Sequence, residues 1–414
     1  MKILWLSNKV LSKKDNGSTG TWLDAMAQGL VDSDQVVLGN ISMGPVKKMT
    51  RQDYGPVSQW IVPSTRKFNH YGLPDAYIVE NIIKTIEEFS PDLVHVWGTE
   101  SYWGILSATK MINLVTLLEM QGLKLAISKV YSGGLSFSEQ MACVGFKELV
   151  LQRCIWNSQK ECERWGEQER SIILGHQFIT TQSRWMESQV KALNRNSRIF
   201  HTDRILREAF YNSQPWQYSG NPVIFCSAAY PSPFKGLHVA IRATAILKQR
   251  FPNVELRIAG AHQNIGVRRD GYIAWICNAI EQAGIGSNVL WLGALSADKI
   301  VAELTKCSAI VIPTYIESYC LALAEAMMLG VPTVVSYTGG TSWLATDEVS
   351  ALYFPPGDEA MCAFQLERIL EDKELSNCLS TAARKFAKQR HNPNAVVMNQ
   401  LKIYRQVISE GAGC

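Results

Sequence analysis

The sequence predicts an α/β protein with two domains, each a doubly wound parallel sheet covered by helices on both faces. Short apolar runs alternate with helical patterns along the chain, and this alternation is typical of parallel sheets. The length of 414 residues exceeds what one ordinary core supports. A stretch at residues 214–222, rich in proline, glycine and asparagine, interrupts the pattern and precedes a fresh strand.

The individual elements follow from the spacing of the apolar residues, which form short runs in the expected strands and recur about every 3.6 residues in the expected helices. The expected strands are Ile3–Leu6, Val36–Leu38, Leu93–Val96, Val115–Leu118, Phe178–Thr181, Val223–Cys226, Leu256–Ala259, Val289–Leu292, Ala309–Ile312, Thr333–Val335 and Leu352–Phe354. The expected helices are Thr21–Leu30, Ile78–Glu88, Lys147–Arg170, Leu237–Arg250, Ala297–Lys306, Leu321–Leu329, Glu374–Gln389 and Asn392–Ser409.

The interruption at 214–222 sets the expected domain boundaries. We expect a Rossmann-like domain at residues 1–215 and a second at 222–391. Ligands of such folds bind at the C-terminal ends of the strands. With two facing domains, the cleft between them is the expected site.

Composition narrows the class of protein. A hydrophobic content of 47% and a charged content of 19% are those of a folded soluble protein. The net charge of +4 gives no sign of nucleic-acid binding. No apolar run is long enough to span a membrane, and the N-terminal residues 1–7 resemble a strand more than a signal peptide. The ten cysteines are scattered, which fits reduced thiols in a cytosol and argues against a zinc site.

Two glutamates, Glu317 and Glu325, form the most informative pattern. The first lies in the turn at a helix start, and the second lies about two turns along the same face, because a turn has about 3.6 residues. The N–H groups of that first turn suit an anionic ligand such as a phosphate. The surrounding helix is apolar on most sides, so Glu325 needs a partner. A ribose diol is one candidate, and an ion pair within the core is the alternative.

Three further loops follow strands and carry candidate binding residues. Gly17 and Gly20 follow the first strand and let the backbone approach a ligand. Lys235, with Gly236 beside it, stands near a helix N-terminus, where a cation opposes the helix dipole unless an anion is also present. The run 339–341, which includes Gly339 and Thr341, follows another strand. For each loop, an ordinary turn or a solvated lysine is the alternative interpretation.

Other features point less clearly to a site. The run 32–34, Asp-Ser-Asp, imitates a metal-binding motif, but it lies away from the C-terminal strand ends, so we interpret it as a polar turn and expect no metal. His95 is a candidate for ligand contact or a structural strand residue; His176 is a weaker candidate. The segment Lys147–Arg170 mixes basic and apolar residues and could rest on an anionic membrane. Its glutamates favour a solvated amphipathic helix instead.

Together these motifs resemble the retaining family-4 glycosyltransferases of the GT-B fold, group 1. Glu317 and Glu325, within Pro-Thr-Tyr-Ile-Glu-Ser-Tyr-Cys-Leu-Ala-Leu-Ala-Glu-Ala, match the Glu-x7-Glu motif of that family, and residues 338–341 and 352–358 also look like it. Residues 229–236, 91–98, 120–123 and 203–211 resemble a subgroup seen among bacterial surface-polysaccharide transferases.

The resemblance implies a role for each matching position. Lys235 would hold the donor diphosphate, and Glu325 would bind the ribose hydroxyls. Glu317 would meet the transferred sugar and the distal phosphate. Lys235 and Glu317 would thus be the catalytic residues. Further donor contacts would come from Gly17, Gly20, Gly236, Ser318, Tyr319, Cys320 and Leu321, and the acceptor side would involve His95, Gln121, Gly339 and Thr341.

Two positions depart from the family pattern. Many members place an arginine about six residues before the lysine, where this chain has Ala229, and many place a histidine in the loop that here carries Gln121. Retaining transfer in this family is thought to need no protein nucleophile, so position and electrostatics would carry the reaction. The histidine's absence therefore does not exclude activity. By the same resemblance, residues 392–414 would cross back as a helix onto the first domain.

The sequence thus predicts a metal-independent, retaining glycosyltransferase that uses a nucleoside-diphosphate sugar, UDP- or GDP-linked. The acceptor would be a glycan or lipid-linked. We expect no cofactor, no nucleic-acid partner and a cytoplasmic location with peripheral contact at the inner face of a bacterial membrane. Two alternatives stay open: a sugar-nucleotide epimerase or glucan synthase on the same fold, and a catalytically degenerate binding subunit. The oligomeric state is not readable from the sequence.

Overall fold

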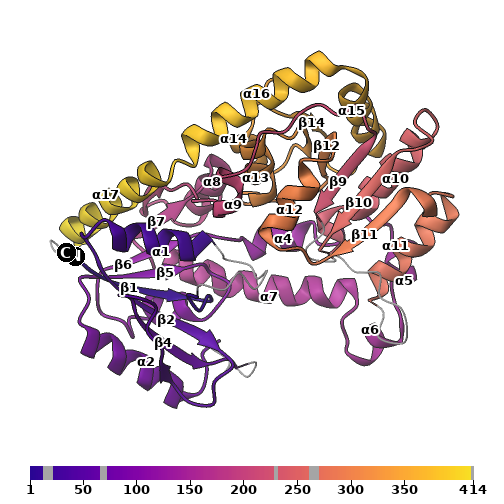
Figure 1. Cartoon of the computed structure of the whole chain (residues 1–414). Helices are drawn as coiled ribbons and strands as arrows, with labels where there is room; N and C mark the ends of the chain where they lie inside the picture. The colour runs from indigo at the N-terminus through magenta and orange to yellow at the C-terminus, as the bar shows by residue number, and fades with distance from the viewer. Residues whose placement is uncertain (13–21, 66–71, 228–231, 261–269, 412–414) are drawn as a thin grey trace. The chain divides into compact units, whose positions relative to one another are not determined.

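The structure is a computed structural model that describes residues 1–12, 22–65, 72–227, 232–260 and 270–411 (Figure 1). The chain divides into two compact units. Unit 1 comprises Met1–Leu125, Arg164–Ile205 and Arg390–Cys414, and unit 2 comprises Ala126–Glu163 and Leu206–Gln389. Each unit is built on a mainly parallel sheet with helices, so the α/β class predicted from the sequence is confirmed. The expected division differs from these units at 126–163 and 206–215, which belong to unit 2, and at 390–391, which belong to unit 1.

Unit 1 contains an eight-stranded sheet in the order β3-β4-β2-β1-β5-β6-β7-β8. Among the described strands of this sheet, only β3 pairs antiparallel, with β4. The strands of this sheet are β1 (Lys2–Ser7), β2 (Val37–Gly44), β3 (Thr50–Arg51), β4 (Ser58–Pro63), β5 (Leu93–Trp97), β6 (Thr116–Glu119), β7 (Phe178–Thr181) and β8 (Arg198–His201). The helices that begin in this unit are α1 (Trp22–Asp32), α2 (Ala76–Phe89), α3 (Trp103–Ala108), α4 (Lys124–Lys129), α8 (Arg184–Leu193) and α17 (Pro393–Gly411).

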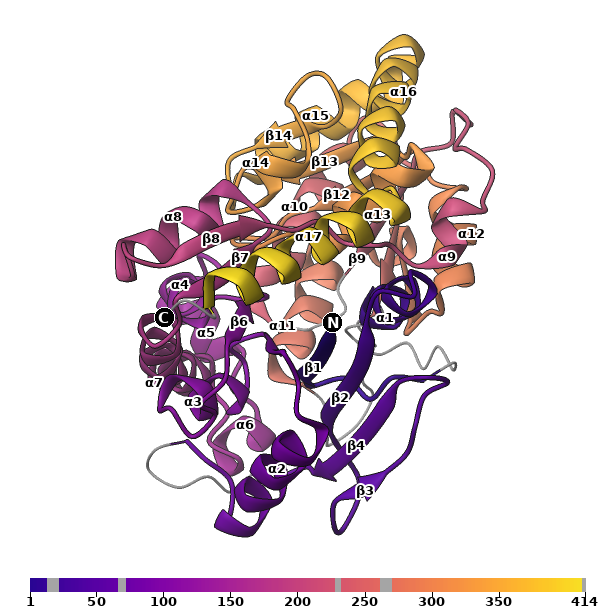
Figure 2. The same cartoon turned by 90° about the vertical axis from the view of Figure 1, so that its left-hand side faces the viewer.

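The C-terminal helix α17 packs on α1 within unit 1, as the yellow and indigo ribbons show (Figure 2). Gly29 of α1 makes this contact close, because a Cβ there would lie 2.6 Å from Cγ2 of Val397. A second tie comes from Tyr404, which is fully buried and whose hydroxyl accepts a hydrogen bond from Nε1 of Trp5 at 3.0 Å. The last helix therefore completes the core of the unit that contains the first strand.

Unit 2 contains an all-parallel six-stranded sheet in the order β11-β10-β9-β12-β13-β14. Its strands are β9 (Val223–Ser227), β10 (Glu255–Ala259), β11 (Val289–Gly293), β12 (Ala309–Ile312), β13 (Thr333–Ser336) and β14 (Leu352–Phe354). Its helices are α5 (Phe137–Ala142), α6 (Phe146–Val150), α9 (Glu208–Tyr211), α10 (Leu237–Lys248), α11 (Gly271–Gln282), α12 (Ala297–Leu304), α13 (Leu321–Leu329), α14 (Thr341–Leu344), α15 (Glu359–Glu371) and α16 (Lys373–Arg390), together with the first part of α7 (Ile155–Leu174) and the 3₁₀ turns η1 (Pro233–Lys235) and η2 (Gly286–Asn288).

Alternate residues of the central strands in unit 2 enter two different cores. Ile224 and Cys226 of β9 belong to one apolar cluster, whereas Phe225 between them belongs to the other. Strand β12 divides in the same way, with Val311 on one face and Ile310 on the other. Since successive side chains of a strand point to opposite faces, both faces of this sheet are buried. Such strands are continuous apolar runs, which explains why the sequence predicted them.

Each sheet reverses its strand order once. In unit 1 the reversal lies between β1 and β5, and in unit 2 between β9 and β12. Loops that follow such strands diverge to opposite sides and leave a crevice at the C-terminal edge of the sheet. The loops after these four strands are therefore the places where the fold favours a ligand.

The long helix expected at Lys147–Arg170 was wrong, because the chain forms two helices there. Helix α6 ends at Val150 and α7 begins at Ile155. Between them Gln152 adopts a left-handed conformation with φ of +52°, which no α-helix accommodates. Strands β3, β4 and β8 were not predicted. Of these, β4 has only three consecutive apolar residues, at 60–62, and β8 has no fully buried residue.

Candidate functional site

The loops after β9, β12 and β13 form one hydrogen-bonded group at the C-terminal edge of the unit 2 sheet. The N–H of Tyr315 donates to the carbonyl of Phe234 at 2.7 Å, which joins the β9 and β12 loops. The hydroxyl of Thr338 donates to the carbonyl of Tyr315 at 2.7 Å, which adds the β13 loop. The three loops therefore hold one another in place at the point where the strand order reverses.

Lys235 and Glu317 meet at this edge, although 82 residues separate them. Nζ of Lys235 lies 2.5 Å from Oε1 of Glu317, and the two side chains are 31% and 19% exposed. Burial by itself lowers the pKa of Lys235, but the Glu317 carboxylate outweighs it and raises the pKa above its ordinary value. The lysine is thus cationic, partly accessible and held by a carboxylate. A diphosphate is an anion of the kind that such an ammonium binds.

Glu325 also has a cationic partner. It is 8% exposed on α13, and its two oxygens accept hydrogen bonds from Nε and Nη2 of Arg207, each at 2.8 Å. This bidentate geometry is the strongest arrangement for such a pair. The ion pair considered from the sequence is therefore present, and the ribose contact stays a prediction. Arg207 was not predicted as a site residue, because nothing in its local sequence indicates a partner 118 residues away.

Glycines in these loops lie close to protein backbone. A Cβ on Gly236, whose φ is +72°, would lie 1.8 Å from the carbonyl oxygen of Pro313. A Cβ on Gly339 would lie 2.0 Å from the carbonyl oxygen of Glu317, and one on Gly340 would lie 2.1 Å from that of Ser318. No other residue fits these positions without moving the loop. The glycines therefore set the position of the Glu317 loop, whether or not a ligand also approaches them.

The remaining predicted donor residues follow Glu317 directly. Ser318 and Leu321 are partly exposed, whereas Tyr319 and Cys320 are each 5% exposed. Cys320 precedes α13 with a φ of +80°. Such a conformation costs a non-glycine residue about 1–3 kcal/mol and is concentrated at functional sites. Thr341 is fully buried, and its hydroxyl donates within the loop to the carbonyls of Ser336 and Thr338.

In unit 1, His95 lies in the interior rather than at an accessible edge. Its side chain has no exposed surface, and its Nδ1 lies 2.8 Å from the hydroxyl of Tyr404. The His95 ring also packs against Trp97 with centroids 4.0 Å apart. Burial is the main reason that the pKa of His95 is lowered. His176 is similarly enclosed, 2.7 Å from both the hydroxyl of Ser107 and the carbonyl of Ile172. These contacts account for both histidines structurally.

A fully buried carboxylate, Glu119, ends β6 and organises the same core. Nη1 of Arg204 lies 2.8 Å from its Oε1. Gln182 and Thr202 donate to the same oxygen at 2.6 and 3.0 Å, and Thr180 donates to Oε2. Burial by itself raises the pKa of Glu119, but Arg204, His95 and Thr180 outweigh it and lower the pKa to about 2. The network fixes the end of the strand that precedes Gln121.

Two further glutamates lie at the C-terminal edge of unit 1, and sequence reasoning missed both. The N–H of Gly122 donates to Oε1 of Glu100 at 2.6 Å, while Oε2 is buried and has no hydrogen-bond partner among the described residues. Glu169 is fully buried and accepts from the Thr99 hydroxyl at 2.5 Å. Burial raises the pKa of Glu169 to about 7, and Glu100 adds to the shift. Gln121 is partly exposed in the same loop.

Some predicted residues cannot be placed. Gly17, Gly20 and Ala229 lie outside the described residues. Within the described part of the chain, no group of three or more histidine, cysteine, aspartate or glutamate side chains could hold a metal ion. Asp32 accepts a hydrogen bond from Gln28 at 2.7 Å, and Asp34 has a φ of +54°, as in a polar turn. None of the helices described here is long and apolar enough to cross a bilayer.

The segment that forms the C-terminal edge of the unit 2 sheet is similar to known proteins. A sequence profile of the glycosyl transferases group 1 matches residues 211–386, which contain the three joined loops. Over these residues the chain is similar to the group 1 glycosyl transferases. The chain is 29% identical over 182 residues to an uncharacterised glycosyltransferase of Bacillus subtilis, YqgM, which covers 44% of this chain and 48% of that protein. The matching segment thus spans less than half of the curated relatives it resembles.

Solved structures extend the likeness to the whole fold. Sucrose-phosphate synthase from Thermosynechococcus elongatus has a TM-score of 0.74 at 16% identity, covering 99% of both chains. Anabaena HepE in complex with UDP-glucose has a TM-score of 0.66 at 16% identity, covering 97% of this chain and 99% of that one. Both structures have the GT-B fold, so the GT-B fold predicted from the sequence is confirmed. The group 1 segment carries Lys235, Glu317 and Glu325.

Proposed function

We propose that this glycosyltransferase moves a sugar from a nucleoside-diphosphate sugar to a glycan or lipid-linked acceptor, with retention of configuration and without a metal. The ion pair between Lys235 and Glu317, at the strand reversal of unit 2, is the observation that carries the proposal. A cation there, joined to a helix start, suits a diphosphate leaving group. HepE was solved with UDP-glucose, which supports a UDP-linked donor.

The proposed donor mode requires a change of partners at Lys235. In the described state its charge is neutralised by Glu317. An incoming diphosphate would take over the ammonium and leave the Glu317 carboxylate to accept hydroxyls of the sugar. Glu325 would bind the ribose hydroxyls while the two hydrogen bonds from Arg207 keep its carboxylate oriented. No side chain needs to act as a nucleophile, because placement and fixed charge supply the catalysis.

A second candidate function is a binding subunit that has lost catalysis. It is favoured by the internal ion pairs, since both glutamates of the motif already have cationic partners. Gln121 also stands where many family members carry a histidine. A sugar-nucleotide epimerase or a glucan synthase on the same fold is a further alternative. Detectable sugar transfer to an acceptor other than glucan would favour the main proposal over both.

Thermal shift with UDP, GDP, ADP, CMP and dTDP, without metal, tests the donor proposal first. A ligand that binds only the folded state raises the melting temperature. A shift with one nucleoside diphosphate identifies the donor class, and its sugars are then assayed for turnover. No shift with any of them, and no turnover, would support the binding subunit.

Lys235→Ala tests the role of the lysine. Loss of one preorganised charge contact lowers turnover by about 10²–10³-fold, with melting temperature within a few degrees of the parent. The matched control is Lys306→Ala, which removes a lysine that pairs with Glu303 on the surface of the same unit and is 62% exposed. Normal turnover in Lys235→Ala would refute the diphosphate assignment.

The ribose assignment has its own test. UDP and its 2′-deoxy analogue are compared by titration on the parent and on Glu325→Gln. If Glu325 binds the ribose, the ratio of the affinities for UDP and for its 2′-deoxy analogue is smaller in the variant than in the parent. The difference between the two proteins in this preference isolates the contact between Glu325 and the ribose. An equal preference in both proteins would mean that Glu325 serves only Arg207.

A further inference from the structure

The segment of α5 and α6 exposes an unusual amount of apolar surface. Six large apolar side chains between residues 137 and 151 are 48–75% exposed: Phe137, Met141, Phe146, Leu149, Val150 and Leu151. Single exposed apolar residues are normal, but six of them within residues 137–151 suggest an interaction site. We call this group, with its two short helices, the α5–α6 face.

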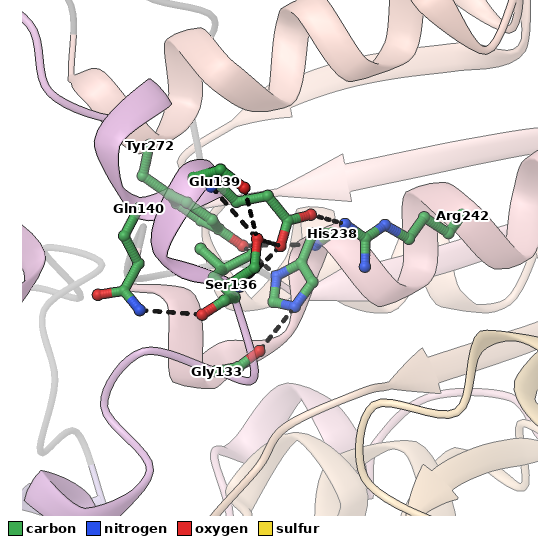
Figure 3. A network of polar contacts seen from close by, with 9 residues as sticks. Gly133, Ser136, Glu139, Gln140, His238, Arg242 and Tyr272 are labelled. Atoms are coloured by element: carbon green, nitrogen blue, oxygen red, sulfur yellow. Dashed lines mark hydrogen bonds and ion pairs between the residues drawn. The ribbon is translucent and has the colours of Figure 1, made fainter.

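The two acidic residues of this segment point the other way. Glu139 pairs with Arg242 of α10 and forms a capping box with Ser136 (Figure 3). Glu148 is 7% exposed and accepts from the N–H groups of Gly145 and Gly271 at 3.1 and 3.0 Å. A helix on an ordinary surface buries its apolar residues and exposes its charges. Here the two acids are used inward and the apolar residues are turned outward.

The segment is held firmly on unit 2, so the exposure belongs to a fixed structure. His238 contacts the carbonyl of Gly133 and the hydroxyl of Tyr272, each at 2.9 Å (Figure 3). At Gly271 a Cβ would lie 1.8 Å from the carbonyl oxygen of Cys143, so α11 and the α5–α6 turn are in backbone contact. The burial of His238 lowers its pKa to about 4, so this anchor stays neutral at ordinary pH.

The charge that accompanies the α5–α6 face is positive. Between residues 134 and 153 the charged side chains are Glu139, Lys147, Glu148 and Arg153. Both glutamates are engaged inward, as above. Neither Lys147 nor Arg153 forms an ion pair with a described residue, although Lys147 acts electrostatically on Asp270. The outward side is therefore apolar with basic residues beside it.

We propose that the α5–α6 face binds the interfacial region of an anionic lipid bilayer. Apolar side chains would enter the boundary of the acyl chains while Lys147 and Arg153 contact the anionic headgroups. No described helix could span the bilayer, so the contact lies in the membrane plane. A symmetric pairing of two copies fits less well, because an isologous contact brings the same basic residues of both copies together. The proposal goes beyond the transferase function and does not depend on the donor.

Vesicle co-sedimentation tests the proposal. The full chain is mixed with vesicles of phosphatidylcholine alone or with added phosphatidylglycerol, in low and high salt. We expect binding to the anionic vesicles that weakens with salt. Phe146→Ser/Leu149→Ser should lower partitioning at least tenfold, and Lys147→Gln/Arg153→Gln should lower it several-fold on anionic vesicles. The matched control is Phe364→Ser, which changes a phenylalanine 53% exposed on α15 and leaves binding unchanged.

Two outcomes would overturn the proposal. One is equal binding by the parent and Phe146→Ser/Leu149→Ser. The other is no vesicle binding together with a dimer, seen by sedimentation, that the same variant dissociates; the face would then join two copies. Hydrogen exchange on the unaltered chain supplies a test without substitutions, since anionic vesicles should slow exchange selectively at residues 137–151. Unchanged turnover of a water-soluble acceptor by Phe146→Ser/Leu149→Ser and Lys147→Gln/Arg153→Gln would show that membrane binding and catalysis are separate properties.

Discussion

Replacing Glu119 by glutamine removes the only carboxylate that meets the buried Arg204 guanidinium among the described contacts. The pKa of Glu119 is lowered to about 2, against 4.5 for an ordinary glutamate. Since one pKa unit corresponds to about 1.4 kcal/mol, ionised Glu119 contributes about 3 kcal/mol to stability. Breaking a buried ion pair by removing one partner costs about 3–5 kcal/mol of stability. The value from the pKa shift and the value for a broken buried pair therefore agree.

The sign of the pH dependence follows from the lowered pKa. A carboxyl whose pKa is lower in the folded state contributes stability above its unfolded pKa. The contribution of Glu119 is therefore complete above about pH 4.5 and is lost as the pH falls towards about 2. Glu119→Gln should lack this part of the acid dependence.

Urea unfolding, followed by tryptophan fluorescence and circular dichroism, measures the effect. We expect Glu119→Gln to lower the free energy of unfolding by about 3–5 kcal/mol at pH 7. Adding Arg204→Met should recover part of that loss, because no charge is then buried alone. The matched control is Glu187→Gln, whose carboxylate is 35% exposed beside His201 and whose loss should cost under about 1 kcal/mol. If Glu119→Gln costs no more than this control, the network is not what stabilises unit 1.

The remaining predictions concern a turn, a buried acid and metal dependence. Gly236→Ala should destabilise unit 2 and weaken nucleotide binding, because the added Cβ would lie 1.8 Å from the carbonyl oxygen of Pro313. The matched control is Gly284→Ala, where φ is +63° but the space is open, and it should cost only about 1 kcal/mol of stability. Equal melting temperatures of the two variants would contradict the close contact at Gly236. Burial raises the pKa of Glu169 to about 7, so the free energy of unfolding of the parent should fall by up to about 3 kcal/mol between pH 4.5 and 7. Glu169→Gln should not show this fall. Parallel curves of stability against pH for the two proteins would refute the prediction. EDTA should leave turnover intact, and an EDTA loss restored by Mn²⁺ would refute the metal-free mechanism.

The sequence by itself determined the class of fold and the main strands. A parallel strand buried on both faces is a continuous apolar run, so β9, β12 and β13 were visible without coordinates. The Glu-x7-Glu spacing and the lysine before a helix were also local, and they indicated the segment that matches the group 1 glycosyl transferases. The roles of those residues with the donor stay predictions.

Only the tertiary structure decided which side chains meet. Lys235 and Glu317 lie 82 residues apart, and Arg207 and Glu325 lie 118 apart, so no local pattern could pair them. The sequence left open whether His95 contacts a ligand or is a structural strand residue, and Trp97 and the distant Tyr404 enclose it. Helices α5 and α6 each combine apolar residues with one glutamate. Whether they face inward or outward depends on Arg242 and Gly271, because the free energy of a side chain is set by its neighbours in space rather than in sequence.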